Sequence, residues 1–566
     1  MMWPPLLVAS LFSGAVYAFP SLDKTAAPNL YPRSSCSGNT ATTRNEWCDF
    51  DISTDYYTEA PDTGVTREYW LELTDGTVAP DGFSRYAQAL NGSIPGPTLI
   101  ADWGDTVVVH VNNALSTSTN GTSLHFHGIR QNYTNQNDGV VSITQCPTPP
   151  GSSITYTWKA TQYGTTWYHS HFGLQAWEGV FGGILINGPA TANYDEDLGV
   201  LFLNDWSHQT ADELYASAET NGPPTLTTGL INGTNVFDDA GHRFNTSFTE
   251  GKTYRLRLVN GAIDTHFKFS IDNHTMQVIS SDLVPIIPYN TSVLDIAIGQ
   301  RYDVIITANQ SSVADNFWMR AIPQSACSSN NNLDDIRGIV YYGSSAGTPT
   351  TTGYSYTDNC VDEDASNLVP YVSKTVSSQT TTVGEAVTVS KNSNNLFKWF
   401  LNSTTMVVDW EDPTLLQVYN GATTFNTSNA VISLPNANEW VYVVISTVIA
   451  VPHPVHLHGF DFYVLAQGTG TYSDSVTLNT DNPPRRDVAM LPASGYLVLA
   501  FETDNPGAWL MHCHIGWHTS EGFGLQWVVR ESEIADLLDY DALNSTCAAW
   551  KSYTSSNSVI EDDSGI

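Results

Sequence analysis

The stretch Leu124-His125-Phe126-His127-Gly128 returns in the last third of the chain as Val455-His456-Leu457-His458-Gly459. A second repeat relates Trp167-Tyr168-His169-Ser170-His171 to Leu510-Met511-His512-Cys513-His514. Side chains two positions apart on a β-strand point to the same face, so each His-x-His pair can bind a metal ion from one strand. The first and last thirds are therefore predicted to be duplicated β-domains, each with two histidine-bearing strands.

The rest of the sequence is also typical of β-structure. Short apolar or alternating runs, such as residues 105–111 (DTVVVHV), are separated by Gly, Pro, Asn and Asp, and long helical patterns are scarce. The middle third has strand-like runs, as at residues 254–260 (YRLRLVN), but no His-x-His pair. Since 566 residues are too many for one hydrophobic core, we predict an all-β fold of three sandwich domains, at residues 34–190, 191–370 and 371–566.

The charge balance excludes several classes of partner. With Lys+Arg 22 and Asp+Glu 57, the net charge is −35 at pH 7, which repels nucleic-acid backbones and anionic membrane surfaces. Only 14% of the residues are charged, while 41% are hydrophobic and 11% aromatic, so sizeable cores can form. We expect a folded protein that binds neither nucleic acid nor membranes.

Several segments indicate secretion. Residues 1–18 are largely apolar and end in Val-Tyr-Ala, which a signal peptidase accepts. Residues 441–451 (VYVVISTVIAV) are too short for a membrane span and are predicted to be a buried strand. Asn-x-Ser/Thr sequons recur along the chain and predict a secreted glycoprotein. They lie at Asn91, Asn120, Asn132, Asn232, Asn245, Asn273, Asn290, Asn309, Asn402, Asn426 and Asn544.

The seven cysteines leave one unpaired if the other six form disulfides in an oxidising compartment. Cys513 is the predicted free thiol, because it alone lies between two histidines. The remaining six allow fifteen pairings. Proximity along the chain favours Cys36–Cys48 and Cys327–Cys360, which leaves Cys146–Cys547 to join the first third of the chain to its end.

Ten of the fifteen histidines fall in four clusters, which chance rarely produces. The clusters are His125 and His127; His169 and His171; His453, His456 and His458; and His512, His514 and His518. Imidazoles with one thiolate suit copper or zinc better than calcium or magnesium, which prefer oxygen ligands. Cys513 points away from its two neighbours, toward a second metal, where His453 and His518 complete a His₂Cys set. A trigonal His₂Cys set is the blue-copper, electron-transfer arrangement, so copper is predicted.

Four motifs give the chain its resemblance to the multicopper oxidases, and among them to the laccases of filamentous ascomycetes. They are His125-Phe126-His127-Gly128, His169-Ser170-His171, His453-Pro454-Val455-His456-Leu457-His458-Gly459 and His512-Cys513-His514-Ile515-Gly516-Trp517-His518. Their order matches the family across essentially the whole chain, which implies three cupredoxin-like Greek-key domains and four copper ions. Phe126 and Phe460 stand where the family usually has Trp and His, but neither position is a ligand.

The resemblance also implies how the copper ions are held. The type 1 copper takes His453, Cys513 and His518, and the type 2 copper takes His125 and His456. The type 3 pair takes His127, His169, His171, His458, His512 and His514. Phe523 occupies the axial position of the type 1 copper, where Phe cannot coordinate, and no methionine follows Cys513. A high reduction potential is therefore expected.

By the same resemblance, the enzyme oxidises phenolic or aromatic substrates in four one-electron steps and reduces O₂ to two waters. Asp138 corresponds to the carboxylate that supplies protons near the type 2 copper, although Asp-Gly is also an ordinary turn dipeptide. Asp205 corresponds to the substrate-pocket carboxylate, although it also fits a surface acid at a strand end. A propeptide ending near Arg33 and a monomer are expected. The last residues, Asp563-Ser564-Gly565-Ile566, are expected to plug the tunnel to the trinuclear cluster.

Two other functions fit the same motifs. One is another multicopper oxidase, such as an ascorbate, bilirubin or metal-ion oxidase; the first two usually carry an axial Met where this chain has Phe523. A ferroxidase needs an acidic site beside the type 1 copper. The other is a secreted copper-binding glycoprotein without turnover, against which the intact ligand set argues. Lignin fragments, melanin or other pigment precursors and plant defence phenols are equally compatible substrates.

Overall fold

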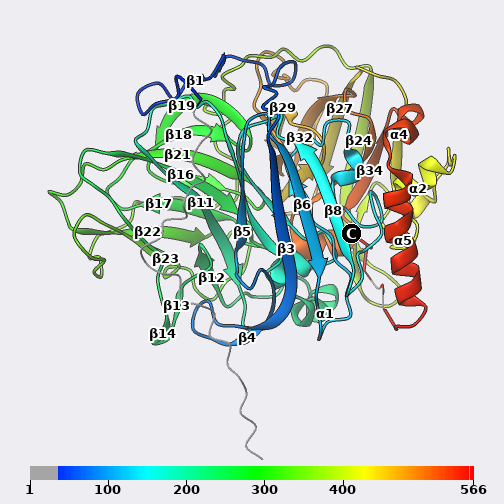
Figure 1. Ribbon diagram of the computed structural model, residues 1–566, viewed down its shortest axis with the longest axis horizontal. Helices are drawn as coiled ribbons and strands as arrows, with labels where there is room; N and C mark the ends of the chain where they lie inside the picture. The colour runs from blue at the N-terminus through cyan, green and yellow to red at the C-terminus, as the bar shows by residue number, and fades with distance from the viewer. Residues whose placement is uncertain (1–35, 560, 562) are drawn as a thin grey trace, which may run out of the picture.

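The computed structural model describes residues 36–559, 561 and 563–566, so the predicted signal peptide and propeptide lie outside the described residues. Its main strands form three pairs of sheets that follow one another along the chain. In Figure 1 the green strands of the second pair lie on the left, the blue strands of the first pair cross the middle, and the red C-terminal helices lie on the right. The prediction of an all-β fold with three sandwiches is confirmed, and the domain boundaries stay predictions.

The first sandwich pairs the sheet β4-β3-β6-β8 with the sheet β5-β10-β9-β7. Its strands are β3 (Thr66–Val78), β4 (Arg85–Leu90), β5 (Gly96–Asp102), β6 (Thr106–Asn113), β7 (His125–His127), β8 (Ser153–Lys159), β9 (Gly164–His169) and β10 (Phe181–Asn187). Alternation in β6 buries Val107, Val109 and Val111 and turns His110 outward, where its ring stacks on exposed Trp70. In β7 all three residues are buried, which places both histidines inside the molecule.

The second sandwich pairs the sheet β12-β11-β16-β21-β18-β19 with the sheet β15-β23-β22-β17-β20. Its strands are β11 (Glu196–Trp206), β12 (Thr228–Ile231), β15 (Asn245–Ser247), β16 (Thr253–Asn260), β17 (Phe267–Ile271), β18 (Met276–Ser281), β19 (Val284–Thr291), β20 (Leu294–Ile296), β21 (Arg301–Thr307), β22 (Asn316–Pro323) and β23 (Arg337–Tyr341). Its apolar core is continuous with that of the third sandwich. This continuity fixes the middle of the chain against the last third.

The third sandwich pairs the sheet β25-β24-β27-β32-β29-β30 with the sheet β26-β34-β33-β28-β31. Its strands are β24 (Thr381–Lys391), β25 (Phe397–Leu401), β26 (Val431–Leu434), β27 (Trp440–Thr447), β28 (His453–Leu457), β29 (Phe462–Thr469), β30 (Arg485–Arg486), β31 (Val488–Leu491), β32 (Gly495–Glu502), β33 (Gly507–Cys513) and β34 (Gly524–Val529). The strand predicted at residues 441–451 is β27, which ends at Thr447, and Val448 is 85% exposed.

Short helices, 3₁₀ turns and ribbons lie in loops within the sandwiches and at the two ends of the described chain. The helices are α1 (Ala211–Asn221), α2 (Thr414–Tyr419), α3 (Gly516–Ser520), α4 (Glu531–Leu537), α5 (Tyr540–Thr554), and the 3₁₀ turns η1 (Asn135–Asn137), η2 (Gln175–Glu178) and η3 (Thr427–Asn429). Two ribbons pair β1 (Glu46–Trp47) with β2 (Phe50–Asp51) and β13 (Val236–Phe237) with β14 (Ala240–Gly241). Within the described part of the chain, each helix is too short or too polar to cross a membrane.

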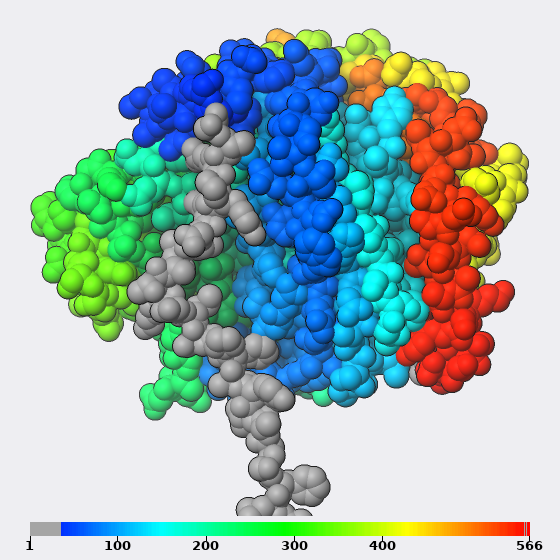
Figure 2. Space-filling view, viewed as in Figure 1, coloured from blue at the N-terminus to red at the C-terminus, as the bar shows by residue number. Residues whose placement is uncertain are grey.

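The disulfide prediction is confirmed at all three pairs, Cys36–Cys48, Cys146–Cys547 and Cys327–Cys360, and Cys513 is a buried free cysteine. The pair Cys146–Cys547 ties α5 to a buried loop of the first sandwich. Figure 2 shows α5 as a red ridge beside the cyan surface of that sandwich. The end of the chain is therefore fastened to its first third, on the side where the two histidine-bearing sandwiches meet.

Candidate metal centres

Four histidine-bearing strands meet where the first and third sandwiches contact each other. β7 pairs with β9, and β28 pairs with β33. Across the contact, the His127 ring stacks on the His456 ring at a centroid distance of 3.9 Å, and the His125 ring lies 4.0 Å from that of His458. All eight side chains of the His-x-His pairs are at most 5% exposed. The two sequence repeats thus build one buried cluster.

The ring nitrogens of this cluster face one another at the spacing of metal ligands. Nε2 of His458 lies 3.3 Å from Nε2 of His512. Each ring donates its Nδ1–H elsewhere, His458 to the Asp138 carboxylate and His512 to the Cys513 carbonyl oxygen, so two lone pairs face each other. A tetrahedral ion with metal–nitrogen bonds of about 2.0 Å separates its ligands by roughly 3.3 Å. The two lone pairs repel each other in the absence of a cation, and a cation between the rings would be coordinated by both.

Three further histidines present a free nitrogen in the same way. Nδ1 of His125, His169 and His456 donates to the main-chain oxygen of Asp138, Ser170 and Asp487, at 2.7, 2.9 and 2.8 Å respectively. Their Nε2 atoms are buried and have no partner among the described residues. Burial lowers the pKa of His169 and His456 well below the usual range, which keeps both rings neutral. Neutral rings held by one nitrogen are the form in which histidine binds metals.

The ligand nitrogens fall into overlapping sets, each within 4.8 Å. They are His125, His127 and His169; His125, His456 and His458; and His171, His458 and His512. His514 lies beside the first set, because its Nε2 is 3.3 Å from Nδ1 of His127. Overlapping sets of this kind fit several adjacent ions better than one.

A second centre lies beyond the cluster. Nδ1 of His453 lies 3.3 Å from Nδ1 of His518, and Cys513 Sγ lies 3.9 Å and 3.6 Å from these two nitrogens. A trigonal ion with bonds of about 2.0 Å to nitrogen and about 2.3 Å to sulfur separates such ligands by roughly 3.5 to 3.7 Å. Burial raises the pKa of the Cys513 thiol, so a bound cation is needed to hold it as a thiolate.

Aromatic side chains surround this second centre. The Phe523 ring is 2% exposed and lies 5.2 Å from the His453 ring, with no coordinating atom of its own. The Trp399 ring lies 4.3 Å from the His518 ring, and its indole N–H donates to the Glu521 carboxylate at 3.0 Å. Burial raises the pKa of Glu521 to about 8. The residues His453, Cys513 and His518 are therefore held in a buried, mainly apolar pocket.

Asp138 lies inside the cluster. Its side chain is buried, with Oδ2 accepting from His458 Nδ1 at 2.9 Å and Oδ1 3.2 Å from His125 Nδ1. It therefore contacts two histidines that come from different sandwiches.

Asp205 lies at the end of β11 with its carboxylate turned into the protein. Oδ1 accepts from the Ile263 N–H at 2.9 Å, and Oδ2 from the N–H groups of Asp264 and Thr265 at 3.0 and 2.9 Å. The Ile263 carbonyl accepts in turn from the Gly516 N–H at 3.0 Å, next to the His518 turn. Asp205 thus fixes a loop that contacts the second centre. Burial, opposed by these hydrogen bonds, raises its pKa.

Asp264 is a second carboxyl group at this place, which we did not predict. It is 4% exposed and lines a small cavity with Pro452, Pro454 and Ile515, all close in sequence to the second-centre residues. Burial and the nearby Asp205 raise its pKa to about 8. No motif marks Asp264, because it belongs to an irregular loop whose position depends on contacts made 59 residues away.

Asp487 was also not predicted. It lies between β30 and β31, is 1% exposed, and contacts His127 and Arg301. Nothing in the local sequence Arg485-Arg486-Asp487-Val488 distinguishes it from a surface turn.

The C-terminal residues pack beside the cluster. Ile566 is 2% and Ser564 1% exposed. The Ser142 hydroxyl donates to the Gly565 oxygen at 2.6 Å, and the Val408 N–H to the Ser564 oxygen at 2.9 Å. A Cβ on Gly524, the residue paired with His512, would lie 3.6 Å from Ile566 Cδ1. The tail is therefore buried against the strand pair that carries His512.

Comparisons with known proteins agree with this geometry. Three multicopper oxidase family models match residues 72–191, 197–344 and 404–533. The chain is 47% identical to Laccase-2 of Botryotinia fuckeliana, over 99% of this chain and 98% of that protein. It matches the crystal structure of a laccase from Botrytis aclada at 47% identity and a TM-score of 0.90, covering 94% of this chain and 100% of that one. Fet3p, a multicopper oxidase that functions in iron import, matches at 26% identity and a TM-score of 0.77, covering 86% and 95%.

Proposed function

The chain belongs to the multicopper oxidase family, and we propose that it works as a secreted laccase, oxidising phenolic or other aromatic donors and reducing O₂ to water. The observation that carries the proposal is the His453, Cys513 and His518 set, joined through the adjacent His512 and His514 to the histidine cluster. Four phenols would each lose one electron and one proton, and one O₂ would take up four of each to give two waters. Copper supplies the one-electron chemistry at both centres.

The four copper ions of the family fit the donor atoms present. We propose His453, Cys513 and His518 as type 1 ligands, and His125 and His456 as type 2 ligands. The remaining histidines of the cluster, His127, His169, His171, His458, His512 and His514, are the proposed type 3 ligands. The free lone pairs and their spacing of 3.3 Å support this assignment. The backbone of residues 512–514 then gives electrons a covalent path between the centres.

The carboxyl groups at both centres are proposed to handle protons. Asp264 lies on the loop that contacts the type 1 turn, and Asp205 at the end of β11 holds that loop; a carboxylate at this place accepts the phenolic proton as the electron leaves. Asp138, buried between His125 and His458, is placed to supply protons where O₂ is reduced. Ile566 is proposed to close one approach to the cluster, which the burial of the C-terminal residues supports.

Secretion and N-glycosylation are supported by two features. None of the eleven sequon asparagines is buried; all except Asn120 and Asn232 are exposed. The three disulfides fit an oxidising compartment. We propose a monomeric extracellular enzyme whose substrates are small phenols, including the fragments released during lignin degradation.

Oxygen uptake tests the proposal. With a methoxyphenol as donor, we expect four phenols oxidised per O₂ consumed and no accumulation of hydrogen peroxide. Fe(II) is measured separately as the alternative electron donor. A larger kcat/KM for Fe(II) than for the phenol would favour a metal-ion oxidase instead, and no O₂ uptake with either would favour a copper-binding glycoprotein.

A further inference from the structure

The second sandwich supplies no histidine to the cluster among the described residues, yet it contacts the cluster directly. The turn between β20 and β21 places Gly299 against His514, so closely that a Cβ on Gly299 would lie 3.0 Å from the His514 ring. Gly299 has φ +82°, a conformation that favours glycine. Two residues later, Arg301 begins β21 and is fully buried. The middle domain therefore reaches the metal site through this turn.

Arg301 holds Asp487 of the third sandwich by a two-point ion pair. Nη1 donates to Oδ1 at 2.6 Å and Nη2 to Oδ2 at 2.5 Å, and both side chains are at most 1% exposed. Nη1 also donates to the Gly299 oxygen at 3.0 Å, which fixes the plane of the guanidinium group. Paired parallel hydrogen bonds define orientation as well as distance, which a single-point ammonium group cannot do.

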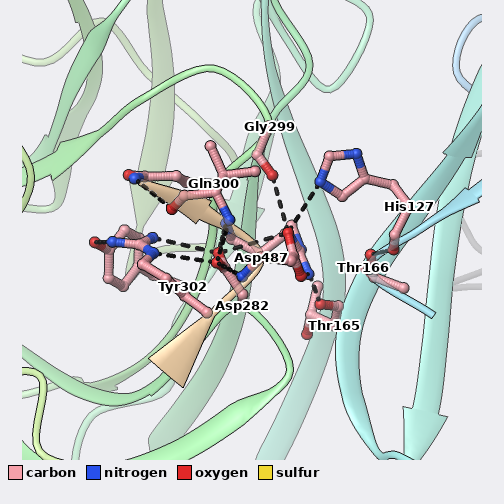
Figure 3. Close-up of polar contacts among 12 residues, drawn as sticks. His127, Thr165, Thr166, Asp282, Gly299, Gln300, Tyr302 and Asp487 are labelled. Atoms are coloured by element: carbon pink, nitrogen blue, oxygen red, sulfur yellow. Dashed lines mark hydrogen bonds and ion pairs between the residues drawn. The ribbon is translucent and has the colours of Figure 1, made fainter. Parts of the chain in front are cut away.

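Asp487 in turn contacts two cluster histidines. Its Oδ1 accepts from His127 Nε2 at 3.1 Å, and its main-chain oxygen accepts from His456 Nδ1 at 2.8 Å. Figure 3 shows Asp487 between Asp282 and Gly299 on one side and His127 on the other. Because a nitrogen that donates a hydrogen bond has no lone pair for a metal, these contacts leave His127 Nδ1 and His456 Nε2 as the ligand atoms.

Neighbouring residues hold both partners of the ion pair. Asp282 of the second sandwich accepts the main-chain N–H of Arg301 at 3.0 Å and that of Asp487 at 3.1 Å. Gly128, directly after His127, has φ +75°, and a Cβ there would lie 2.4 Å from both Arg301 Nη2 and Asp487 Oδ2. The glycine of the His-x-His-Gly motif thus leaves room for the Arg301–Asp487 pair.

We propose that Arg301 is a positioning residue for the trinuclear cluster: through Asp487 it fixes which nitrogen of His127 faces the metal and where that ring lies. The inference rests on the proposed function, because only a copper-loaded cluster gives the selected nitrogen a role. An ion pair that only joined the domains would support both centres alike. A positioning residue affects the cluster selectively and spares the type 1 centre.

The test compares Arg301→Lys and Asp487→Asn with the control Arg320→Lys. Arg320 makes an equivalent two-point pair with Asp272 at 2.7 and 2.8 Å, within the second sandwich and without contact to the described cluster residues. Each copper-loaded protein is incubated with EDTA, and the blue thiolate-to-copper band, total copper and the electron paramagnetic resonance of non-blue Cu(II) are followed. We expect both cluster-side variants to lose non-blue copper at least about tenfold faster than wild type while the blue band persists.

Two outcomes would overturn the inference. One is release of non-blue copper at the wild-type rate. The other is parallel loss of blue and non-blue copper, or failure to fold, in Arg301→Lys and Asp487→Asn while Arg320→Lys stays intact, which would make the pair purely structural. A wild-type protein with neither blue band nor cluster copper would refute the proposed function itself, so the two failures are distinguishable.

Discussion

Nδ1 of His453 and Nδ1 of His518 lie 3.3 Å apart, although the two residues are 65 positions apart in sequence. His453 begins β28 and His518 lies in α3, so the contact depends on the turn that follows β33. Burial lowers the pKa of His453 to about 3 and that of His518 well below the usual range, so neither ring is protonated at neutral pH. With Cys513 beside them, the two nitrogens form the proposed type 1 copper site.

At the proposed type 1 site, Phe523 is expected to keep the reduction potential high, because it supplies no axial ligand. Phe523→Met should add an axial thioether, stabilise Cu(II) and lower the type 1 potential by roughly 60 mV, a tenfold change in the one-electron equilibrium. A redox titration of the blue band measures it. Phe523→Leu, which adds no donor, is the control and should leave the potential nearly unchanged. A potential unaltered by Met would place Phe523 away from the axial position.

Asp264 and Asp205 should matter for substrates that lose a proton together with an electron. Asp264→Asn is expected to lower kcat/KM for a phenol by at least about tenfold and to spare a non-phenolic dye. Asp205→Asn should likewise lower kcat/KM more for the phenol than for the dye. Some loss on the dye is also expected, because the Asp205 carboxylate orders residues 263–265. Equal losses on both substrates in Asp264→Asn would show that Asp264 does not accept the phenolic proton.

The candidate copper ligands could be predicted from sequence because the patterns that mark them are local. His125 and His127 share a strand face, and the neighbours of Cys513 make it the exceptional thiol. The Arg301–Asp487 pair joins residues 186 positions apart from different sandwiches, and neither carries a motif. The position of Asp264 depends on the hydrogen bond that its main-chain N–H donates to Asp205, which the sequence does not indicate. Local alternation and the family motifs therefore pointed to the candidate ligands, whereas the residues that hold them in place depend on tertiary packing.

The buried C-terminus should protect the cluster. Deleting residues 563–566 removes Ile566 from beside the His512 strand pair and should alter O₂ reduction or copper retention. Reduction of the blue band by substrate without oxygen should stay close to the wild-type rate, since Ile566 lies beside the strand pair that carries His512, a proposed type 3 ligand. Wild-type turnover and copper content in the truncated enzyme would show that the tail has no such role.

Glu385 should make the free energy of unfolding depend on pH. It lies on the inward face of β24 between Val383 and Val387, is 8% exposed, and burial raises its pKa to about 7. The folded state then binds more protons than the unfolded state between about pH 4.5 and 7, so this group's stability contribution falls as pH rises through that window. Because the carboxyl keeps some solvent contact, the effect is on the order of 1 kcal/mol.

Glu385→Gln should therefore raise the unfolding free energy at pH 8 more than at pH 5, as measured by denaturant titration. Glu68→Gln, at an exposed position of β3, is the control and should change neither value. An equal effect of Glu385→Gln at both pH values would contradict the assigned pKa.

A copper count combined with a visible spectrum, on wild type and Cys513→Ser, decides whether Cys513 binds a copper ion beside a copper-loaded histidine cluster. We expect four coppers per chain and an intense blue thiolate-to-copper band in wild type. Cys513→Ser should lose the band and phenol oxidation together while its histidine cluster still binds copper. A blue band that persists without the Cys513 thiolate, or a copper-loaded wild type without that band, would refute the proposed type 1 site.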